Sequence, residues 1–437
     1  MPSTVNRQPS TVKSLQIFQV MRQSAVILTS IGLAKSGLTT GEIGQYETLL
    51  YLGTVLTFFW VNGLLQSIAP LHANMDEGER KTFTFNVFAL FCAVSAGLFL
   101  LLFFGKSFAL PLLTGLNDAP FFGLFCVYLL LNLPAFPVEF FYLVRGQSRQ
   151  ILAWGVVSFG LHLVALFVPI WLGWGLGGGI SGLVGLAGLR FLWAVGLVFR
   201  LSKPILDRDL LQKYLRFAAP LMASTMAGHL VLMFDNWLVG WWYGDAATFA
   251  IYRYGAKELP LAPALALSLG TALVPQLTAD LPAGMAALKA SSRRLFHWLF
   301  PGTIVMIFAA KPLFPVVFNP DFAASAPIFS IYLLITATRV LLPNSIILAK
   351  NAPRLALRAS LCELAVKVVL GFVGIHFWGL AGVAASAVLA FWVEKLLLMW
   401  WLERDFGVKT SDWLDVRTYL FYVAAMLAAF AAAVFVG

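Results

Sequence analysis

The chain has 437 residues, of which 60% are hydrophobic and only 11% are charged, and its mean hydropathy is +0.84. Soluble domains carry about 25% charged residues, so this composition excludes a soluble globular protein and indicates a polytopic membrane protein. The formal net charge of +10 resides mostly in short loops between apolar segments, where membrane topology accounts for it. We therefore expect no nucleic-acid partner.

Apolar runs and helix-breaking residues predict an all-α fold of about thirteen helices. In chain order, the predicted helices span residues 14–34, 45–71, 83–104, 119–144, 150–173, 178–200, 211–240, 246–276, 295–318, 323–349, 356–377, 379–402 and 417–436. The fourth is expected to bend at Pro134 and Pro137, and Pro260 and Pro263 interrupt the eighth, because proline removes a backbone hydrogen-bond donor.

The charges in the loops between these helices alternate along the chain. Alternate loops, beginning with the N-terminal segment, hold 20 Lys and Arg residues, whereas the opposite loops hold only Lys35, Lys106 and Lys311. Basic loops remain in the cytoplasm, so the pattern predicts a cytoplasmic N-terminus in a multi-pass membrane protein.

The two halves of the chain resemble each other at a spacing of about 205 residues. Ser-Ile-Ala-Pro ending at Pro70 matches Ala-Leu-Val-Pro ending at Pro275, and Arg145 matches Lys350. Six helices repeated in the same orientation predict two parallel lobes with a substrate site between them. The predicted parts are a six-helix lobe over 1–200, a cytoplasmic linker over 201–216, a second six-helix lobe over 211–403, and a loop with one additional helix over 404–437.

Charged residues inside the apolar segments are the strongest functional signal, because each costs roughly 2.5–3.5 kcal/mol at the membrane centre unless it faces a wet cavity or a counter-ion. A hydrated, mainly cationic passage for an anionic solute explains them. The candidate substrate-binding residues are Arg22, Arg190, Arg253, Lys257, Arg339 and Asn62. The candidate coupling or charge-network residues are Glu47, Glu139, Asp235, Glu258, Glu363 and Lys367.

Each charged residue also has a structural alternative. Arg253 and Lys257 are four residues apart and share a helical face with Ser268 and Thr271, but Glu258 and Asp235 could hold them instead. Arg22 could extend to the membrane surface. The other two alternatives concern pairing within the membrane: Glu363 and Lys367 could pair along one helix, and Arg190 and Arg339 could each pair between helices.

The sequence carries no motif for catalysis. It has no nucleophile motif, no nucleotide-binding loop and no metal-ligand spacing among its His and Cys residues, so we expect neither enzymatic activity nor a cofactor or metal.

Four stretches resemble the Wzx-type polysaccharide flippases of the multidrug/oligosaccharidyl-lipid/polysaccharide (MOP) exporter superfamily. They are Gly44-Gln-Tyr46 with the stretch from there to Pro70, Phe234-Asp-Asn-Trp-Leu-Val-Gly240 with the Tyr-Gly pair at 243–244, Leu348-Ala-Lys-Asn351, and Trp378-Gly-Leu-Ala-Gly-Val-Ala-Ala385. The resemblance implies a MATE-like fold in a bacterial inner membrane, with two lobes around a cavity that opens alternately to the two membrane faces.

The resemblance also implies a cargo, a polyprenyl-pyrophosphate-linked oligosaccharide flipped to the outer leaflet for surface polysaccharide biosynthesis. Membrane lipids and polysaccharide polymerase or assembly proteins are the further partners that it implies. Two alternatives stay open, a lipid II-type flippase and a MATE-like drug/cation antiporter. An antiporter would need acids to dominate the cavity of the first lobe, where Glu47 and Glu139 are candidates.

Overall fold

The structure is a computed structural model that describes residues 8–73, 75–116, 119–259 and 262–436. All regular secondary structure among these residues is helical. The chain forms two compact units, of which the first comprises Met1–His229 with Gly244–Ala247 and the second comprises Leu230–Tyr243 with Thr248–Gly437. One helix, α9, contributes to both units, and the predicted lobe boundary at residues 201–216 stays a prediction.

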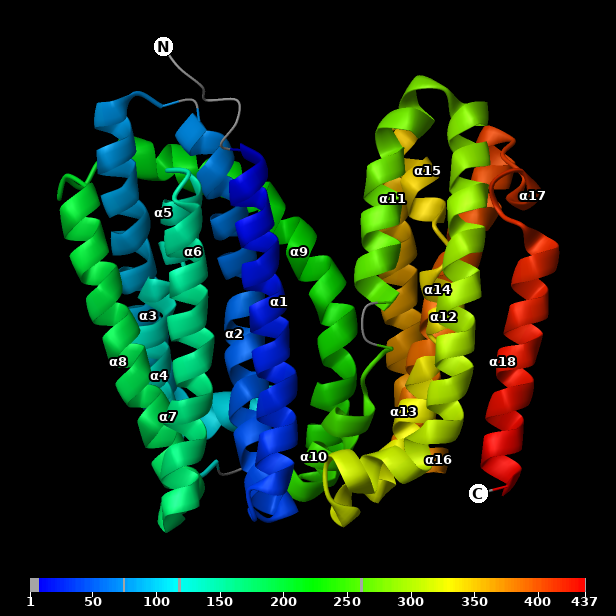
Figure 1. Ribbon diagram of the computed structural model, residues 1–437, viewed down its shortest axis with the longest axis horizontal. Coiled ribbons are helices and arrows are strands. Elements are labelled where there is room, and N and C mark those ends of the chain that lie inside the picture. The colour runs from blue at the N-terminus through cyan, green and yellow to red at the C-terminus, as the bar shows by residue number, and fades with distance from the viewer. Residues whose placement is uncertain (1–7, 74, 117–118, 260–261, 437) are drawn as a thin grey trace. The chain divides into compact units, whose positions relative to one another are not determined.

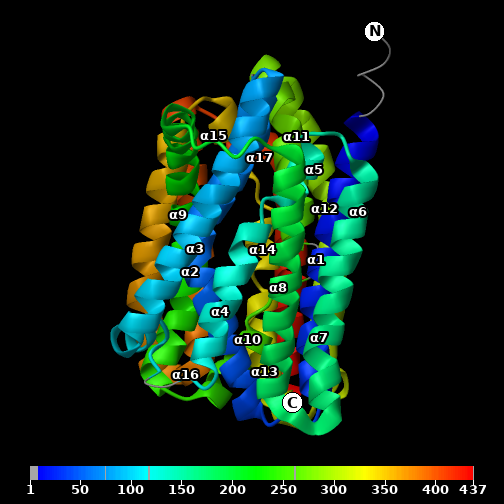
Figure 2. The same ribbon diagram turned by 90° about the vertical axis from the view of Figure 1, so that its left-hand side faces the viewer.

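The first unit is built from long apolar helices, two of which are interrupted by short irregular turns (Figure 1). Its elements are α1 (Gln8–Lys35), α2 (Thr40–Ala73), α3 (Glu77–Thr114), α4 (Phe122–Asn132), η1 (Leu133–Ala135), α5 (Val138–Leu143), α6 (Ser148–Gly155), η2 (Val156–Gly160), α7 (Leu161–Pro169), η3 (Ile170–Trp174), α8 (Gly175–Leu201) and the first part of α9 (Arg208–Tyr243). Here η1 is a 3₁₀ turn, whereas η2 and η3 are π-helical turns. On one face of this unit, α3, α4 and α8 lie side by side (Figure 2).

The second unit continues from α9 and has the same helical character. Its further elements are α10 (Ala246–Gly255), α11 (Ala262–Ala279), α12 (Leu281–Val317), η4 (Pro320–Ala324), α13 (Ser325–Leu333), α14 (Thr336–Arg339), α15 (Pro343–Ala349), α16 (Pro353–Phe406), α17 (Thr410–Trp413) and α18 (Val416–Val436). The core of this unit includes contacts of α12 with α11, α13 and α18, and of α16 with α13 and α15.

Ten helical segments among the described residues are long and apolar enough to cross a membrane. Two of them, Ser148–Leu201 and Pro353–Phe406, each contain two of the predicted helices joined at a turn. Large apolar side chains are exposed along these segments, for example Phe104, Trp298 and Val316. Water would penalise such exposure but lipid would not, so these surfaces fit a membrane environment and the predicted all-α polytopic fold is confirmed.

Proline positions explain the main irregularities. The predicted bend in the fourth helix is confirmed, because η1 and a turn at Phe136–Pro137 separate α4 from α5. The helix predicted over 246–276 is interrupted, as its prolines indicated, but the break begins earlier than they do: α10 ends at Gly255 and α11 begins at Ala262, with Pro263 in its first turn. Proline is tolerated in the first turn of a helix but interrupts its interior. The other proline of this break, Pro260, lies outside the described residues.

Glycine allows the chain to reverse direction within α16. Gly379 has a φ of 58° and a ψ of −138°, a conformation open to glycine but strained for other residues, and it separates the predicted helices 356–377 and 379–402. The two arms then approach so closely that a Cβ atom on Gly382 would lie 2.0 Å from the Gly374 carbonyl oxygen. Small residues at this crossing are therefore required for the two helices to pack.

We expect Gly382→Val to destabilise the protein by several kcal/mol, because the added side chain must push the two arms of α16 apart. Gly196→Val on α8 is the matched control, since a Cβ atom there meets no other atom within 4 Å. Thermal unfolding of the detergent-purified variants, followed by tryptophan fluorescence, compares them. Equal unfolding temperatures for the two variants would contradict the close helix crossing.

Candidate functional site: a two-arginine pocket in the first unit

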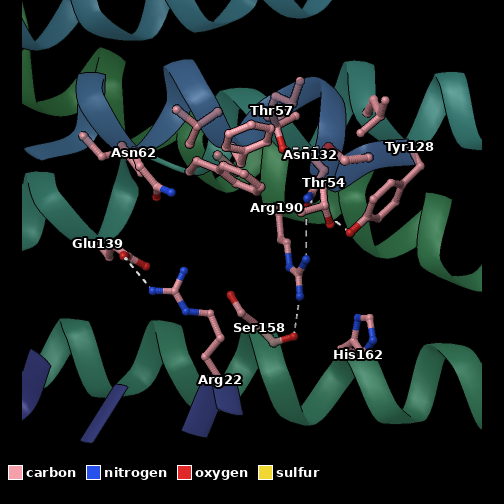
Figure 3. A pocket seen from close by; sticks show the side chains of 18 of the residues that line it. Arg22, Thr54, Thr57, Asn62, Tyr128, Asn132, Glu139, Ser158, His162 and Arg190 are labelled. Atoms are coloured by element: carbon pink, nitrogen blue, oxygen red, sulfur yellow. Dashed lines mark hydrogen bonds and ion pairs between the residues drawn. The ribbon is translucent and has the colours of Figure 1, made fainter. Parts of the chain in front are cut away.

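The first unit contains a pocket of about 440 Å³, lined by residues of α1, α2 and α4 to α9 and of the turns η1 and η2 (Figure 3). Four of the predicted site residues line it: Arg22 from α1, Asn62 from α2, Glu139 from α5 and Arg190 from α8. Helix packing, rather than closeness in sequence, brings these side chains together. Glu139 is the one carboxylate among the described lining residues, so the pocket holds two guanidinium groups and one acid.

One end of the pocket is formed by Arg22 and Glu139 (Figure 3). The Arg22 Nη2 atom lies 3.8 Å from the Glu139 Oε1 atom, and the Arg22 guanidinium also donates to the Gln19 side-chain oxygen. Glu139 is buried in the first turn of α5, where the helix dipole favours a carboxylate, while the Arg22 side chain is 44% exposed. Arg22 thus faces the pocket but has a counter-ion.

The other end of the pocket is formed by Arg190, whose guanidinium is held by neutral groups. Its Nη1 atom donates to the Asn132 Oδ1 atom at 3.0 Å, and its Nη2 atom donates to the Ser158 carbonyl oxygen. Within the part of the chain that the structure describes, no carboxylate lies within ion-pair distance of Arg190. Arg190 therefore both lines the pocket and bonds between helices, but its partners are neutral, so among the described residues its positive charge stays uncompensated.

The walls between the two ends combine aromatic rings with polar side chains. The aromatic lining residues are Phe18, Phe58, Phe125, Tyr128, Phe136, Trp154 and Phe159, and the polar ones include Thr54, Thr57, Asn62, His162 and His229. The rings of His229 and Phe58 stack at 4.7 Å. Such walls suit a ligand with an anionic group and a polar, ring-shaped part, because aromatic faces pack on apolar ring surfaces while amides and hydroxyls hydrogen-bond.

The second unit also buries charged residues, several of which form ion pairs. The Lys367 Nζ atom lies 2.9 Å from the Asp235 Oδ2 atom and donates to the Val231 carbonyl oxygen at 2.7 Å. Tyr332 donates to the same carboxylate at 2.7 Å. The expected pairing of Lys367 with Glu363 along one helix is therefore wrong: Lys367 on α16 bonds across to α9, where Asp235 is the one acid of the described chain within ion-pair distance of its ammonium group.

A second pair neutralises Arg339. Its guanidinium makes two hydrogen bonds to the Glu258 carboxylate, at 2.6 and 2.7 Å, and lies 4.4 Å from the centre of the Phe391 ring. The sequence left open whether Arg339 binds the substrate or pairs with another segment, and the structure shows the pairing. The Glu363 Oε1 atom is buried and has no hydrogen-bond partner among the described residues.

Arg253 and Lys257 do not share the helical face that the sequence predicted. Arg253 lies in α10, whereas Lys257 follows the end of that helix, so the stripe through Ser268 and Thr271 is broken by the loop before α11. The Arg253 guanidinium lies 3.5 Å from the Asn236 side-chain oxygen, and the Lys257 ammonium lies 5.0 Å from the centre of the Tyr254 ring. The two acids named in the alternative, Glu258 and Asp235, form ion pairs with Arg339 and Lys367.

Sequence reasoning missed several pocket residues. Asn132 and Ser158 hold Arg190, yet nothing in a lone Asn or Ser of an apolar helix indicates a partner on another helix. The prolines just after Asn132 were the one available signal, since they mark a break in α4. Glu47, a predicted network residue, is buried in α2 and does not line the pocket. Among the described residues, no group of three potential ligands could hold a metal ion.

Solved structures similar to this chain share its fold. A structure of the lipid II flippase MurJ in an inward closed conformation matches with a TM-score of 0.70 and 14% identity, covering 96% of this chain and 92% of that one. An inward-facing multidrug resistance MATE family transporter of the MOP superfamily matches with a TM-score of 0.63 and 14% identity, covering 88% and 94%. A MOP superfamily transporter from Pyrococcus furiosus matches with a TM-score of 0.59 and 15% identity, covering 93% and 99%. The fold is thus MATE- and MurJ-like.

No curated protein sequence matches the chain. A family model described as "Polysaccharide biosynthesis protein" matches residues 17–279, which is more than half of the chain and includes every residue named above in the two-arginine pocket. The resemblance inferred from the sequence is confirmed by this match. The chain has the multi-pass helical fold of these solved structures, and it belongs to the polysaccharide biosynthesis protein family.

Proposed function

We propose that this protein flips a polyprenyl-pyrophosphate-linked oligosaccharide from the cytoplasmic to the outer leaflet of the membrane, and that the anionic head of this lipid binds in the two-arginine pocket. The observation that carries the proposal is Arg190, a cation inside a membrane-spanning helix that neutral groups hold and no described carboxylate compensates. Keeping such a charge is costly unless a ligand uses it, and buried charges in transporters commonly mark substrate pathways.

The chemistry of the pocket suits this cargo. A pyrophosphate offers several anionic oxygens, and guanidinium groups bind such oxygens through charge-assisted, often bidentate hydrogen bonds. The volume of about 440 Å³ lies in the range that holds a drug-sized ligand, so a pyrophosphate with the first sugar fits, and the polyprenyl tail can stay in the bilayer. The aromatic and amide side chains of the walls would contact the sugar.

A drug/cation antiporter is the less favoured function for this pocket. Such a protein would bind a cation at an acid, but Glu139 is paired with Arg22 and a second, uncompensated arginine shares the pocket. A cationic drug would be repelled by that arginine, whereas an anionic head group would be attracted to it. The charges that line the pocket therefore favour the flippase.

The testing experiment replaces Arg190 in cells. Arg190→Gln should abolish surface glycan while leaving the amount of protein in the membrane unchanged, because the head of the lipid loses its uncompensated cation. Arg404→Gln is the matched control, since Arg404 is half exposed and lies beside Asp405 at the end of α16. Normal glycan export by Arg190→Gln, with export equally normal in the control, would overturn the proposal.

The orientation in the membrane forms part of the proposal, with the N-terminus and the predicted linker at residues 201–216 in the cytoplasm. A cysteine at residue 245, introduced as Asp245→Cys, should react with a membrane-impermeant maleimide added outside the cell, whereas Arg208→Cys should react only after lysis. The three native cysteines must first be replaced by serine or alanine. Labelling of residue 208 from outside would reverse the proposed direction of transport.

A further inference from the structure

Two atoms at the Arg190 end of the pocket are buried without a hydrogen-bond partner among the described residues. They are the Arg190 Nε atom and the Ser158 Oγ atom, and Ser158 is only 4% exposed. Both atoms are hydrogen-bond donors, and both residues line the pocket. Buried donors are rarely left unpaired, so this pair of unused donors beside a guanidinium points to a missing acceptor.

The group that now holds Arg190 is easily released. Ser158 lies in the π-helical turn η2, an irregularity that often occurs at functional sites. Its carbonyl oxygen accepts a hydrogen bond from the Leu161 amide as well as from the Arg190 Nη2 atom. If the guanidinium moved away, this carbonyl would therefore keep a partner. Asn132, the other group on Arg190, is a neutral amide whose nitrogen donates to the Tyr128 hydroxyl at 3.2 Å.

We propose that the Arg190 end of the pocket is a phosphate subsite in a self-liganded resting state. The carbonyl oxygen of Ser158 and the amide oxygen of Asn132 stand where phosphate oxygens bind, and an incoming phosphate group displaces the Ser158 carbonyl from the guanidinium (Figure 3). The Ser158 hydroxyl then donates to the phosphate. Arg22 is not the first phosphate ligand, because Glu139 competes for it. This inference rests on the proposed function and names the part of the cargo that the pocket recognises.

Asn132→Asp tests the subsite with little change in shape. The new carboxylate would lie on the Arg190 guanidinium, which keeps the packing but supplies the negative charge that phosphate would bring. We expect the affinity for a polyprenyl pyrophosphate, measured with protein in nanodiscs of zwitterionic lipid, to fall about 30-fold or more. Asn62→Asp is the control, because it adds the same charge to the same pocket at the Arg22 end. Equal losses in the two variants would overturn the subsite.

Ser158→Ala separates a ligand contact from a structural role. Since the Ser158 hydroxyl has no partner among the described residues in the resting state, its removal should leave the unfolding temperature unchanged or slightly raised. The affinity for the polyprenyl pyrophosphate should nevertheless fall about tenfold, the effect of losing one hydrogen bond to a charged group. Unchanged affinity in Ser158→Ala, together with unchanged affinity in Asn132→Asp, would show that Arg190 serves packing only.

Two competing ligands identify the source of the phosphate. Competition by inorganic pyrophosphate, but not by phosphatidylglycerol, would support a subsite for the diphosphate head of the cargo. Competition by phosphatidylglycerol would support the phosphate subsite and assign it to a resident lipid. Because binding is measured without transport, the two proposals fail separately. If Asn132→Asp abolishes binding of the polyprenyl pyrophosphate, the subsite is supported even when no glycan is flipped. If the wild-type protein flips the glycan but Asn132→Asp binds the polyprenyl pyrophosphate normally, the subsite alone is overturned.

Discussion

Lys367→Met is expected to destabilise the second unit by about 3–5 kcal/mol, because it leaves the Asp235 carboxylate buried without its counter-ion. Both residues are at most 2% exposed, and the Asp235 Oδ1 atom already lacks a hydrogen-bond partner among the described residues. The hydrogen bond from Tyr332 would then remain, but it does not replace the lost positive charge. Unfolding of the purified protein in detergent, followed by tryptophan fluorescence against a denaturant, measures the loss.

A double variant distinguishes a broken ion pair from poor packing of methionine. Asp235→Asn combined with Lys367→Met removes both charges, so most of the lost stability should return. Lys81→Met serves as the surface control, since the Lys81–Glu77 pair is exposed and should contribute less than about 1 kcal/mol. A double variant as unstable as Lys367→Met alone would contradict the ion-pair explanation.

Removing the positive charge at residue 190 should strongly reduce translocation, and placing a positive charge at the neighbouring residue 132 should partly restore it. Arg190→Asn removes the uncompensated charge and should lower the rate of lipid-linked glycan translocation by about 100-fold or more, since the loss of two charge-assisted hydrogen bonds of at least about 1.5 kcal/mol each amounts to about 3 kcal/mol. Adding Asn132→Arg returns a guanidinium to the same end of the pocket, because the two side chains are in direct contact. Partial recovery of the rate is expected in this swapped variant.

The measurement is translocation in proteoliposomes, normalised to the amount of folded protein. Arg339→Asn is the control variant, since Arg339 is neutralised by Glu258 in the second unit. Adding Asn132→Arg to Arg339→Asn should not rescue any defect that Arg339→Asn causes. If the swapped variant is no better than Arg190→Asn although both fold, Arg190 acts through its particular packing and not through its charge.

The helical architecture was largely predictable because membrane helices are recognisable by their length and apolarity. The reversal of the chain near Gly379 was predicted at the correct place, since this glycine separates two apolar runs. The interruption of the helix predicted over 246–276 was foreseen from its prolines, but not its extent, because the chain already ends α10 at Gly255 and starts α11 at Ala262. The π-helical turns η2 and η3 could not be foreseen, because no repeated residue pattern distinguishes them from a regular helix.

Only part of the candidate pocket was predictable from the sequence. The rarity of charges inside apolar segments correctly drew attention to Arg22, Glu139 and Arg190, which converge on one pocket. The same rarity applies to Lys367 and Arg339, which instead form ion pairs with Asp235 and Glu258. Sequence separation hides these partners, because the paired residues come from distant segments that meet only in the folded unit. A charge inside a membrane helix therefore predicts a partner without identifying it.

Translocation by the purified protein tests the central claim most directly. Proteoliposomes would carry a fluorescent polyprenyl-pyrophosphate-linked sugar in both leaflets, and an added membrane-impermeant quencher would report how fast the inner-leaflet fraction becomes accessible. We expect the wild-type protein to accelerate this exchange well above protein-free vesicles, and to leave unchanged the exchange of an analogue whose pyrophosphate is replaced by an uncharged linkage. Equal acceleration of both lipids, or of neither, would contradict recognition of the anionic head by the two-arginine pocket.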